Sequence, residues 1–126
     1  MEKIKTAIIG CGKVAAAHAN SYKKIPNALL TAVYDLDAER AKTFADTYKV
    51  KAYTDIAAMI KEEHIQAVSI CTPHPFHAET CVKAAEQGCS VIVEKPFAVS
   101  TSDCRMMIDA GKRNNVKIGS LFQRRF

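Results

Sequence analysis

The sequence lacks several patterns that would assign it to a particular class of protein. It has no Cys-x-x-Cys pair and no other zinc-ligand spacing, so it predicts no metal site. It has no basic tail and no basic stripe with interleaved aromatic residues, which argues against nucleic acid as a partner. No apolar run is long enough to cross a bilayer, so a membrane is not expected either. These absences leave an ordinary globular protein.

Size and charge are those of one unremarkable domain. The chain has 126 residues, of which 48% are hydrophobic and 25% charged. The formal net charge of +5 would suit an anionic ligand. The lysines, however, are scattered among acidic residues along the expected helices, so most of them are interpreted as solvated surface charges.

The cysteines indicate a reducing compartment. They are odd in number and mostly occupy apolar positions of expected elements, which favours buried thiols over disulfides. The first expected strand begins almost at Met1 and leaves no room for a signal peptide, so we expect a cytoplasmic location. The five residues are Cys11, Cys71, Cys81, Cys89 and Cys104.

The stretch from Thr6 to Ala15 has the form of a strand that turns directly into a helix. Gly10 permits the tight turn, Gly12 lets the backbone approach a bulky anion, and Ala15 keeps the helix close to the strand. Free N–H groups at the start of that helix, together with its dipole, would bind a pyrophosphate. By itself this G-x-G-x-x-A pattern is weak evidence, because glycine turns between strands and helices are common.

The rest of the chain alternates apolar strand segments with amphipathic helices. The pattern predicts a doubly wound parallel sheet, the Rossmann fold, with six strands in the order 3-2-1-4-5-6 between two helical layers. In the last helix we expect Cys104, Met107, Ile108 and Gly111 to face inward. The expected strands are Ile4–Ile9, Leu29–Tyr34, Val50–Tyr53, Ala67–Cys71, Ser90–Val93 and Val116–Phe122, and the helices are Val14–Lys24, Ala38–Tyr48, one from Ile56, one from Phe76 to Gly88, and Ser100–Asn114.

Asp35 closes the second strand about twenty residues after Ala15, where a carboxylate can accept hydrogen bonds from both ribose hydroxyls of an adenosine dinucleotide. It would repel a 2′-phosphate, so NAD is favoured over NADP. Arg40 weakens this preference a little, because its side chain could fold toward a phosphate. The alternative is that Asp35 or Asp37 caps the following helix, in which case one acid could cap while the other binds.

Lys95 is the candidate catalytic residue. It directly follows a buried strand and precedes a proline, at the edge of the sheet where ligands bind in folds of this type. Its ammonium could hydrogen-bond a substrate hydroxyl and stabilise the alkoxide that develops as hydride leaves for a nicotinamide. The alternative is a surface lysine paired with Glu94.

The chain resembles the glucose-fructose oxidoreductase and inositol dehydrogenase (Gfo/Idh/MocA) family of NAD(P)-dependent oxidoreductases over essentially its whole length. Glu94-Lys95-Pro96 is the most specific element of the resemblance, which also includes Gly10, Gly12, Ala15, His18, Asp35, Thr72, Pro73, His77 and Arg124.

The resemblance also implies roles for these residues at the coenzyme. It places Gly12, Lys13 and Val14 at the pyrophosphate and Asp35 at the adenosine ribose. Thr72 and Pro73 lie at the middle of the cofactor, Glu94 and Lys95 at the nicotinamide, His77 beside the cofactor, and Arg124 after the last strand.

The same resemblance implies a second domain outside this chain. Residues 1–126 would be the NAD(P)-binding domain, and the second domain would supply the proton acceptor, most of the sugar or cyclitol pocket and the interface of a homo-oligomer. The expected function is therefore an NAD-dependent dehydrogenase, and the chain alone would have little activity. The alternative is a dinucleotide-binding sensor without catalysis, since the same fold serves both classes.

Overall fold

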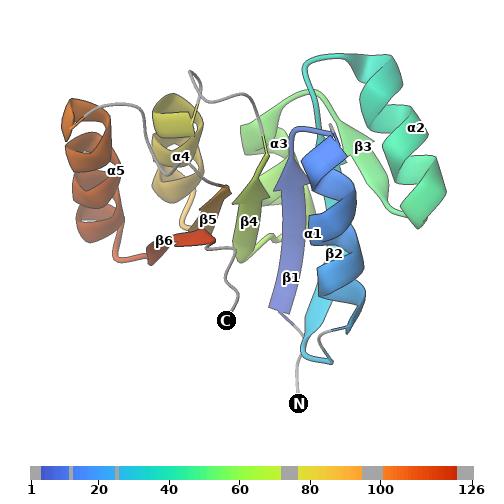
Figure 1. Cartoon of the computed structure of the whole chain (residues 1–126), viewed down its shortest axis with the longest axis horizontal. Coiled ribbons are helices and arrows are strands. Elements are labelled where there is room, and N and C mark those ends of the chain that lie inside the picture. The colour runs from blue at the N-terminus through green and yellow to red at the C-terminus, as the bar shows by residue number, and fades with distance from the viewer. Residues whose placement is uncertain (1–3, 12, 25, 72–76, 95–100, 122–126) are drawn as a thin grey trace.

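The computed structural model describes residues 4–11, 13–24, 26–71, 77–94 and 101–121. Strands and helices alternate through all of these segments, as the sequence predicts (Figure 1). The strands are β1 (Ile4–Ile9), β2 (Ala28–Tyr34), β3 (Lys51–Tyr53), β4 (Ala67–Ile70), β5 (Ser90–Glu94) and β6 (Ile118–Leu121), and the helices are α1 (Lys13–Lys24), α2 (Ala38–Tyr48), α3 (Ile56–Glu63), α4 (His77–Glu86) and α5 (Thr101–Asn114).

The strands form one six-stranded parallel sheet in the order β3-β2-β1-β4-β5-β6, which confirms the predicted Rossmann topology. At the central pair, Ile9 of β1 lies opposite Tyr34 of β2 and Ile70 of β4. The order reverses beside β1, so the carboxyl ends of β1 and β4 flank the switch point, at the upper edge of the sheet in Figure 1. Ligands of doubly wound sheets bind at such a point.

The two faces of the sheet carry separate apolar clusters, because side chains along a strand alternate between faces. Ile8 packs with Ala15 and Tyr22 of α1 and with Ala45 of α2. The apolar cluster on the opposite face is larger and is covered by α3, α4 and α5. Its buried residues include Ala7, Ile9, Ile56, Met59, Ile60, Val68, Ile70, Cys81, Ala84, Val91 and Met107.

Two aspartates fix where helices begin. Asp37 caps α2 by accepting hydrogen bonds from the N–H groups of Glu39 (3.0 Å) and Arg40 (3.2 Å). Asp55 caps α3 by accepting from the N–H of Ala58 at 3.0 Å. Such caps satisfy backbone donors that have no partner within the helix, and each typically contributes about 1 kcal/mol.

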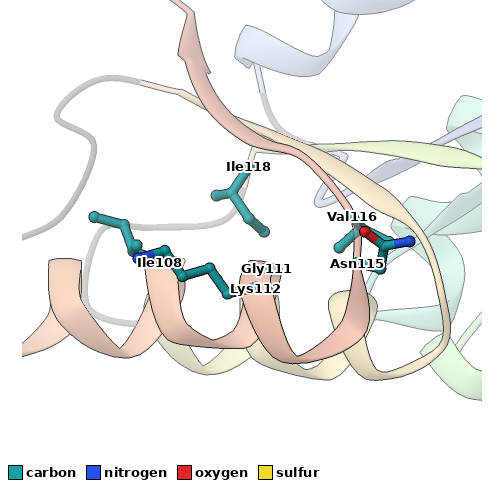
Figure 2. Close-up of a pocket in the computed structure, with 6 residues that line it drawn as sticks. All are labelled: Ile108, Gly111, Lys112, Asn115, Val116 and Ile118. Carbon is teal, nitrogen blue, oxygen red and sulfur yellow. The ribbon is translucent and has the colours of Figure 1, made fainter.

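The predicted inward orientation of Ile108 is wrong. Met107, Ala110 and Gly111 are the buried positions of α5 in the described residues, whereas Ile108 is 47% exposed. One step along a helix rotates a side chain by about 100°, which carries Ile108 past the sheet and onto the rim of a shallow groove. Figure 2 shows this groove, which has a volume of about 430 Å³ and is lined by Ile108, Gly111, Lys112, Asn115, Val116 and Ile118.

The last strand is also shorter than expected, since it begins at Ile118 rather than Val116. Asn115 adopts a positive φ of 55° after the end of α5, and the chain needs this turn before pairing with β5 can start. Gly111 permits α5 to approach the new strand closely, because a Cβ at this position would lie 2.7 Å from Cγ1 of Ile118.

Candidate functional site

Gly10 and Ala15, which lie at the two ends of the glycine pattern, are placed as the sequence predicts. Gly10 has a φ of 98°, a region that favours glycine, and its N–H donates to the carbonyl of Tyr34 at 2.8 Å. Ala15, one turn into α1, is fully buried, so a larger side chain would push the helix away from the sheet. The chain thus turns sharply and presents the start of α1 to the carboxyl edge of the sheet.

Asp35 is bound to this turn by a hydrogen bond. The whole Asp35 residue is 7% exposed, and Oδ2 of its carboxylate accepts a hydrogen bond from the N–H of Cys11 at 2.9 Å. Oδ1 accepts from the N–H of Asp37, also at 2.9 Å. Asp37 caps α2 and Asp35 contacts the glycine turn, so the two acids have the separate roles that the sequence left open.

The Asp35 carboxylate also interacts electrostatically with the side chains of Arg40 and Cys11. Arg40 lies on the first turn of α2, and its Nη1 is 3.8 Å from Oδ2 of Asp35. Burial, and secondarily the Asp35 carboxylate, raise the pKa of the Cys11 thiol to about 12. Cys11 is therefore a neutral thiol near pH 7, and it contacts Asp35 through its backbone N–H rather than through its sulfur.

The structure describes only part of the predicted site. Besides Gly10 and Asp35, it places the backbone of Lys13 and Val14 at the start of α1, of His77 at the start of α4 and of Glu94 at the end of β5. Their side chains are not among those described. Gly12, Thr72, Pro73, Lys95 and Arg124 lie outside the described residues.

Parallel pairing nevertheless brings the predicted segments to one edge. The N–H of Cys71 donates to the carbonyl of Ile9 at 2.7 Å, so the segment after β4 starts beside the glycine turn. Ile70 pairs with Val93 on the other side, which puts Glu94 at the same edge. The four segments that carry the predicted contacts therefore leave the sheet next to one another, after β1, β2, β4 and β5.

Sequence reasoning missed one buried polar pair beneath this edge. The hydroxyl groups of Tyr22 in α1 and Ser69 in β4 lie 2.5 Å apart. Tyr22 is 8% exposed and Ser69 is 1% exposed, so this contact supplies a hydrogen bond to two hydroxyl groups that have little access to water. The signal in the sequence is a serine inside an otherwise apolar strand.

Two negative findings apply to the described part of the chain. It contains no group of three or more His, Cys, Asp or Glu side chains placed to hold a metal ion. None of its helices has the length and apolar character needed to cross a membrane.

The residues present fit an adenosine dinucleotide. A carboxylate has about four acceptor positions, and backbone N–H groups occupy two of those on Asp35, so two remain for the hydroxyls of a ribose. The same carboxylate is fixed against the glycine turn that opens α1, where a pyrophosphate would meet free N–H groups and the positive end of the helix dipole. The fold and this pairing define a dinucleotide-binding Rossmann domain.

The chain belongs to the oxidoreductase family whose members share an NAD-binding Rossmann fold (GFO_IDH_MocA), and the family model matches residues 4–122. This match confirms the resemblance to the family and the fold class.

Individual relatives agree with the family assignment. The chain is 37% identical to a scyllo-inositol 2-dehydrogenase (NADP(+)) of Bacillus subtilis over 114 residues, which cover 90% of this chain and 35% of the relative. It is 34% identical to a 2,7-anhydro-N-acetylneuraminate hydratase of Mediterraneibacter gnavus over 116 residues, or 92% of this chain and 30% of the relative. The crystal structure of myo-inositol 2-dehydrogenase from Lactobacillus plantarum superposes with a TM-score of 0.83 at 30% identity, covering 95% of this chain and 36% of that one. The chain thus spans about a third of the length of these relatives.

Proposed function

We propose that this chain is the coenzyme-binding part of a dehydrogenase that transfers hydride between NAD and a secondary hydroxyl of a sugar, a sugar derivative or a cyclitol. The observation that carries the proposal is the hydrogen bond from the Cys11 N–H to Asp35, because it joins the expected ribose acceptor to the expected pyrophosphate turn. The dehydrogenases of scyllo-inositol and myo-inositol among the similar proteins support the substrate class.

Each part of the coenzyme has a proposed contact. Asp35 accepts the adenosine ribose hydroxyls, and Leu36, which is 83% exposed directly after it, offers an apolar surface to the adenine. Gly12, Lys13 and Val14 surround the pyrophosphate, and Thr72, Pro73 and His77 border the middle of the molecule.

The chemistry is proposed to take place beyond the end of β5. The nicotinamide supplies the site that accepts or donates hydride. Lys95 would hydrogen-bond the substrate hydroxyl and stabilise negative charge on its oxygen, with Glu94 beside it. Because the relatives are about three times as long as this chain, we propose that the proton acceptor, most of the substrate pocket and an oligomer interface come from outside these residues.

Titration with NADH and NADPH, followed by coenzyme fluorescence, tests the coenzyme assignment. The wild-type protein should bind NADH more tightly than NADPH. Asp35→Ala should weaken NADH binding by about tenfold or more, because two charge-assisted hydrogen bonds to the ribose are lost. It should change NADPH binding little, because relief of the repulsion between the carboxylate and the 2′-phosphate offsets the loss of the bond from the Cys11 N–H. Asp46→Ala, which removes an exposed acid of α2, is the matched control and should leave both affinities unchanged.

Two results would contradict the assignment. If Asp35→Ala weakened NADH and NADPH equally, Asp35 would not be the group that distinguishes them. If neither coenzyme bound the wild-type protein, the dinucleotide site itself would be rejected. The role of Lys95 is tested separately in the complete enzyme. Lys95→Ala should lower kcat with little change in NADH affinity. An unchanged kcat would favour the alternative that Lys95 is a surface lysine without a catalytic role.

A second candidate reaction has no net oxidation, and the similarity to a hydratase favours it. The two are separated by product analysis with catalytic amounts of NAD. A dehydrogenase forms one NADH for each product molecule, whereas a hydratase accumulates product without accumulating NADH.

A further inference from the structure

We propose that the hydrogen bond between Tyr22 and Ser69 positions the start of α1 for the pyrophosphate of the coenzyme. This inference rests on the proposed function, in which the pyrophosphate meets the N–H groups at the opening of α1. The two side chains lie beneath the binding edge and act through the helix, so they are positioning residues rather than ligand contacts.

The bond joins two elements that meet at the switch point of the sheet. Tyr22 lies near the end of α1, and Ser69 lies in β4, the strand that pairs with β1 on one side and with β5 on the other. Two residues after Ser69, Cys71 leads into the segment that carries the predicted contacts with the middle of the coenzyme. The bond therefore fixes α1 relative to the strand that supplies the neighbouring part of the expected site.

Apolar contacts alone would leave the direction of α1 less fixed. Ala15 and Ala19 are fully buried in the same cluster as Tyr22, and their small side chains permit close approach of the helix to the sheet. Such packing is non-directional, whereas a hydrogen bond weakens when its two groups lose their alignment. The Tyr22–Ser69 bond thus adds a directional restraint at the far end of the helix.

The length of α1 converts a small rotation at Tyr22 into a displacement at the expected site. At about 1.5 Å per residue, Tyr22 lies about 14 Å along the helix axis from Lys13, so a tilt of about 5° would move the start of α1 by about 1 Å. A shift of this size misaligns the N–H groups with a bound anion. Because both hydroxyls are buried, water does not readily replace one that is removed.

The probe pair is ADP-ribose, which contains the pyrophosphate, and adenosine, which lacks it. Calorimetry measures the first affinity and titration followed by nuclear magnetic resonance measures the second. Tyr22→Phe should weaken ADP-ribose by about fivefold, because the N–H groups at the start of α1 are no longer held in place. Adenosine should change by less than about twofold, since its ribose contacts Asp35 at the end of β2. Ser69→Ala should have the same two effects as Tyr22→Phe.

Two further variants separate position from stability. The double variant Tyr22→Phe with Ser69→Ala leaves no buried hydroxyl unpaired, so it should regain part of the stability but retain the weakened affinity for ADP-ribose. Met107→Ala removes a buried side chain from the apolar cluster on the opposite face of the sheet. It should lose more stability than Tyr22→Phe and yet, at a temperature where it is folded, bind ADP-ribose as the wild-type protein does.

Three results would overturn the inference and leave the proposed function intact, provided that the wild-type protein binds ADP-ribose and NADH. They are unchanged affinity of Tyr22→Phe for ADP-ribose, equal weakening of both probes, and recovery of affinity together with stability in the double variant. If the wild-type protein binds neither ADP-ribose nor NADH, the proposed function and this inference fail together. Circular dichroism of each variant verifies that it is folded at the temperature of the titration.

Discussion

The two halves of the sheet are held together in different ways. In the half formed by β1, β2 and β3, side-chain hydrogen bonds join segments that are distant in sequence, such as Asp35 to Cys11 and Tyr53 to Glu63. In the half formed by β4, β5 and β6, the described contacts are mainly apolar, with Met107 buried in the larger core cluster. Hydrogen bonds fix direction, whereas apolar packing is non-directional. Among the described residues, the half that bears the candidate ribose acceptor is therefore the one with more side-chain hydrogen bonds between separate segments.

The largest expected effect tests the apolar half with two adjacent methionines of α5. Met107 is fully buried and Met106 is 44% exposed. Met107→Ala should lower the free energy of unfolding by about 3 kcal/mol, because it removes buried apolar surface and leaves a cavity. Met106→Ala should change it by less than about 0.5 kcal/mol. Urea denaturation of both variants measures the difference, and similar losses would mean that α5 does not pack as described.

A smaller effect is expected at the seam between the halves. Tyr22→Phe removes one partner of the bond between α1 and β4 and leaves the buried Ser69 hydroxyl unpaired, so it should cost about 1.5 kcal/mol. Ser69→Ala added to Tyr22→Phe should recover part of this loss, because no polar group then remains unpaired. Thermal denaturation of the single and double variants gives the coupling energy. Strictly additive losses would show that the two hydroxyls do not interact.

The smallest effect concerns pH and the polar half. The Tyr53 hydroxyl donates to Glu63 at 2.6 Å, and this bond, aided by Lys51 at 3.3 Å, lowers the pKa of Glu63 below its ordinary value of 4.5. A lowered folded-state pKa gives stabilisation that is present above pH 4.5 and is lost as the pH falls through the folded-state value.

Melting temperatures between about pH 6 and pH 3 should therefore fall less steeply in Glu63→Gln than in the wild-type protein, by the equivalent of about 0.5 kcal/mol. Glu79→Gln, an exposed acid on α4, is the control. Parallel curves for wild-type protein and Glu63→Gln would show that the pair has no net effect on stability. At the alkaline end, the hydrogen bond to the Glu63 carboxylate raises the pKa of Tyr53 above its ordinary value of 10. The stabilisation from this bond is therefore fully present below pH 10 and is lost as the pH rises through the higher folded-state pKa.

Local patterns in the sequence predicted the strand order and most element bounds, because each element is defined by its own residues. Glycine at a turn with positive φ, aspartate at a helix start and apolar spacing along a strand all act within a few positions of themselves. The orientation of Ile108 was predicted wrongly because helical spacing identifies the side of α5 that is buried but not how far around the helix the burial extends. That extent depends on what covers α5 beside β6, which is the edge strand of the sheet.

The candidate site was predictable in composition but not in contacts. The spacing of Gly10 and Asp35 indicated that both would face one ligand. It gave no sign that Asp35 would accept a hydrogen bond from Cys11, since that contact depends on how β1 and β2 pair across the sheet. The Tyr22–Ser69 bond was missed because it depends on how α1 packs against β4, which lies far away in the sequence.

The bond between Asp35 and the Cys11 N–H has a consequence for engineering coenzyme preference. A substitution that removes the Asp35 carboxylate to admit a 2′-phosphate also removes the acceptor of the Cys11 N–H. The turn between β1 and α1 then loses a hydrogen bond that helps to fix it. Affinity for the diphosphate portion should then decline together with selectivity, even for fragments that contain no sugar at that end. Swapping coenzymes in this scaffold therefore calls for a replacement such as asparagine, which removes the charge and retains one oxygen that can accept from the Cys11 N–H, at the cost of the bond from the Asp37 N–H.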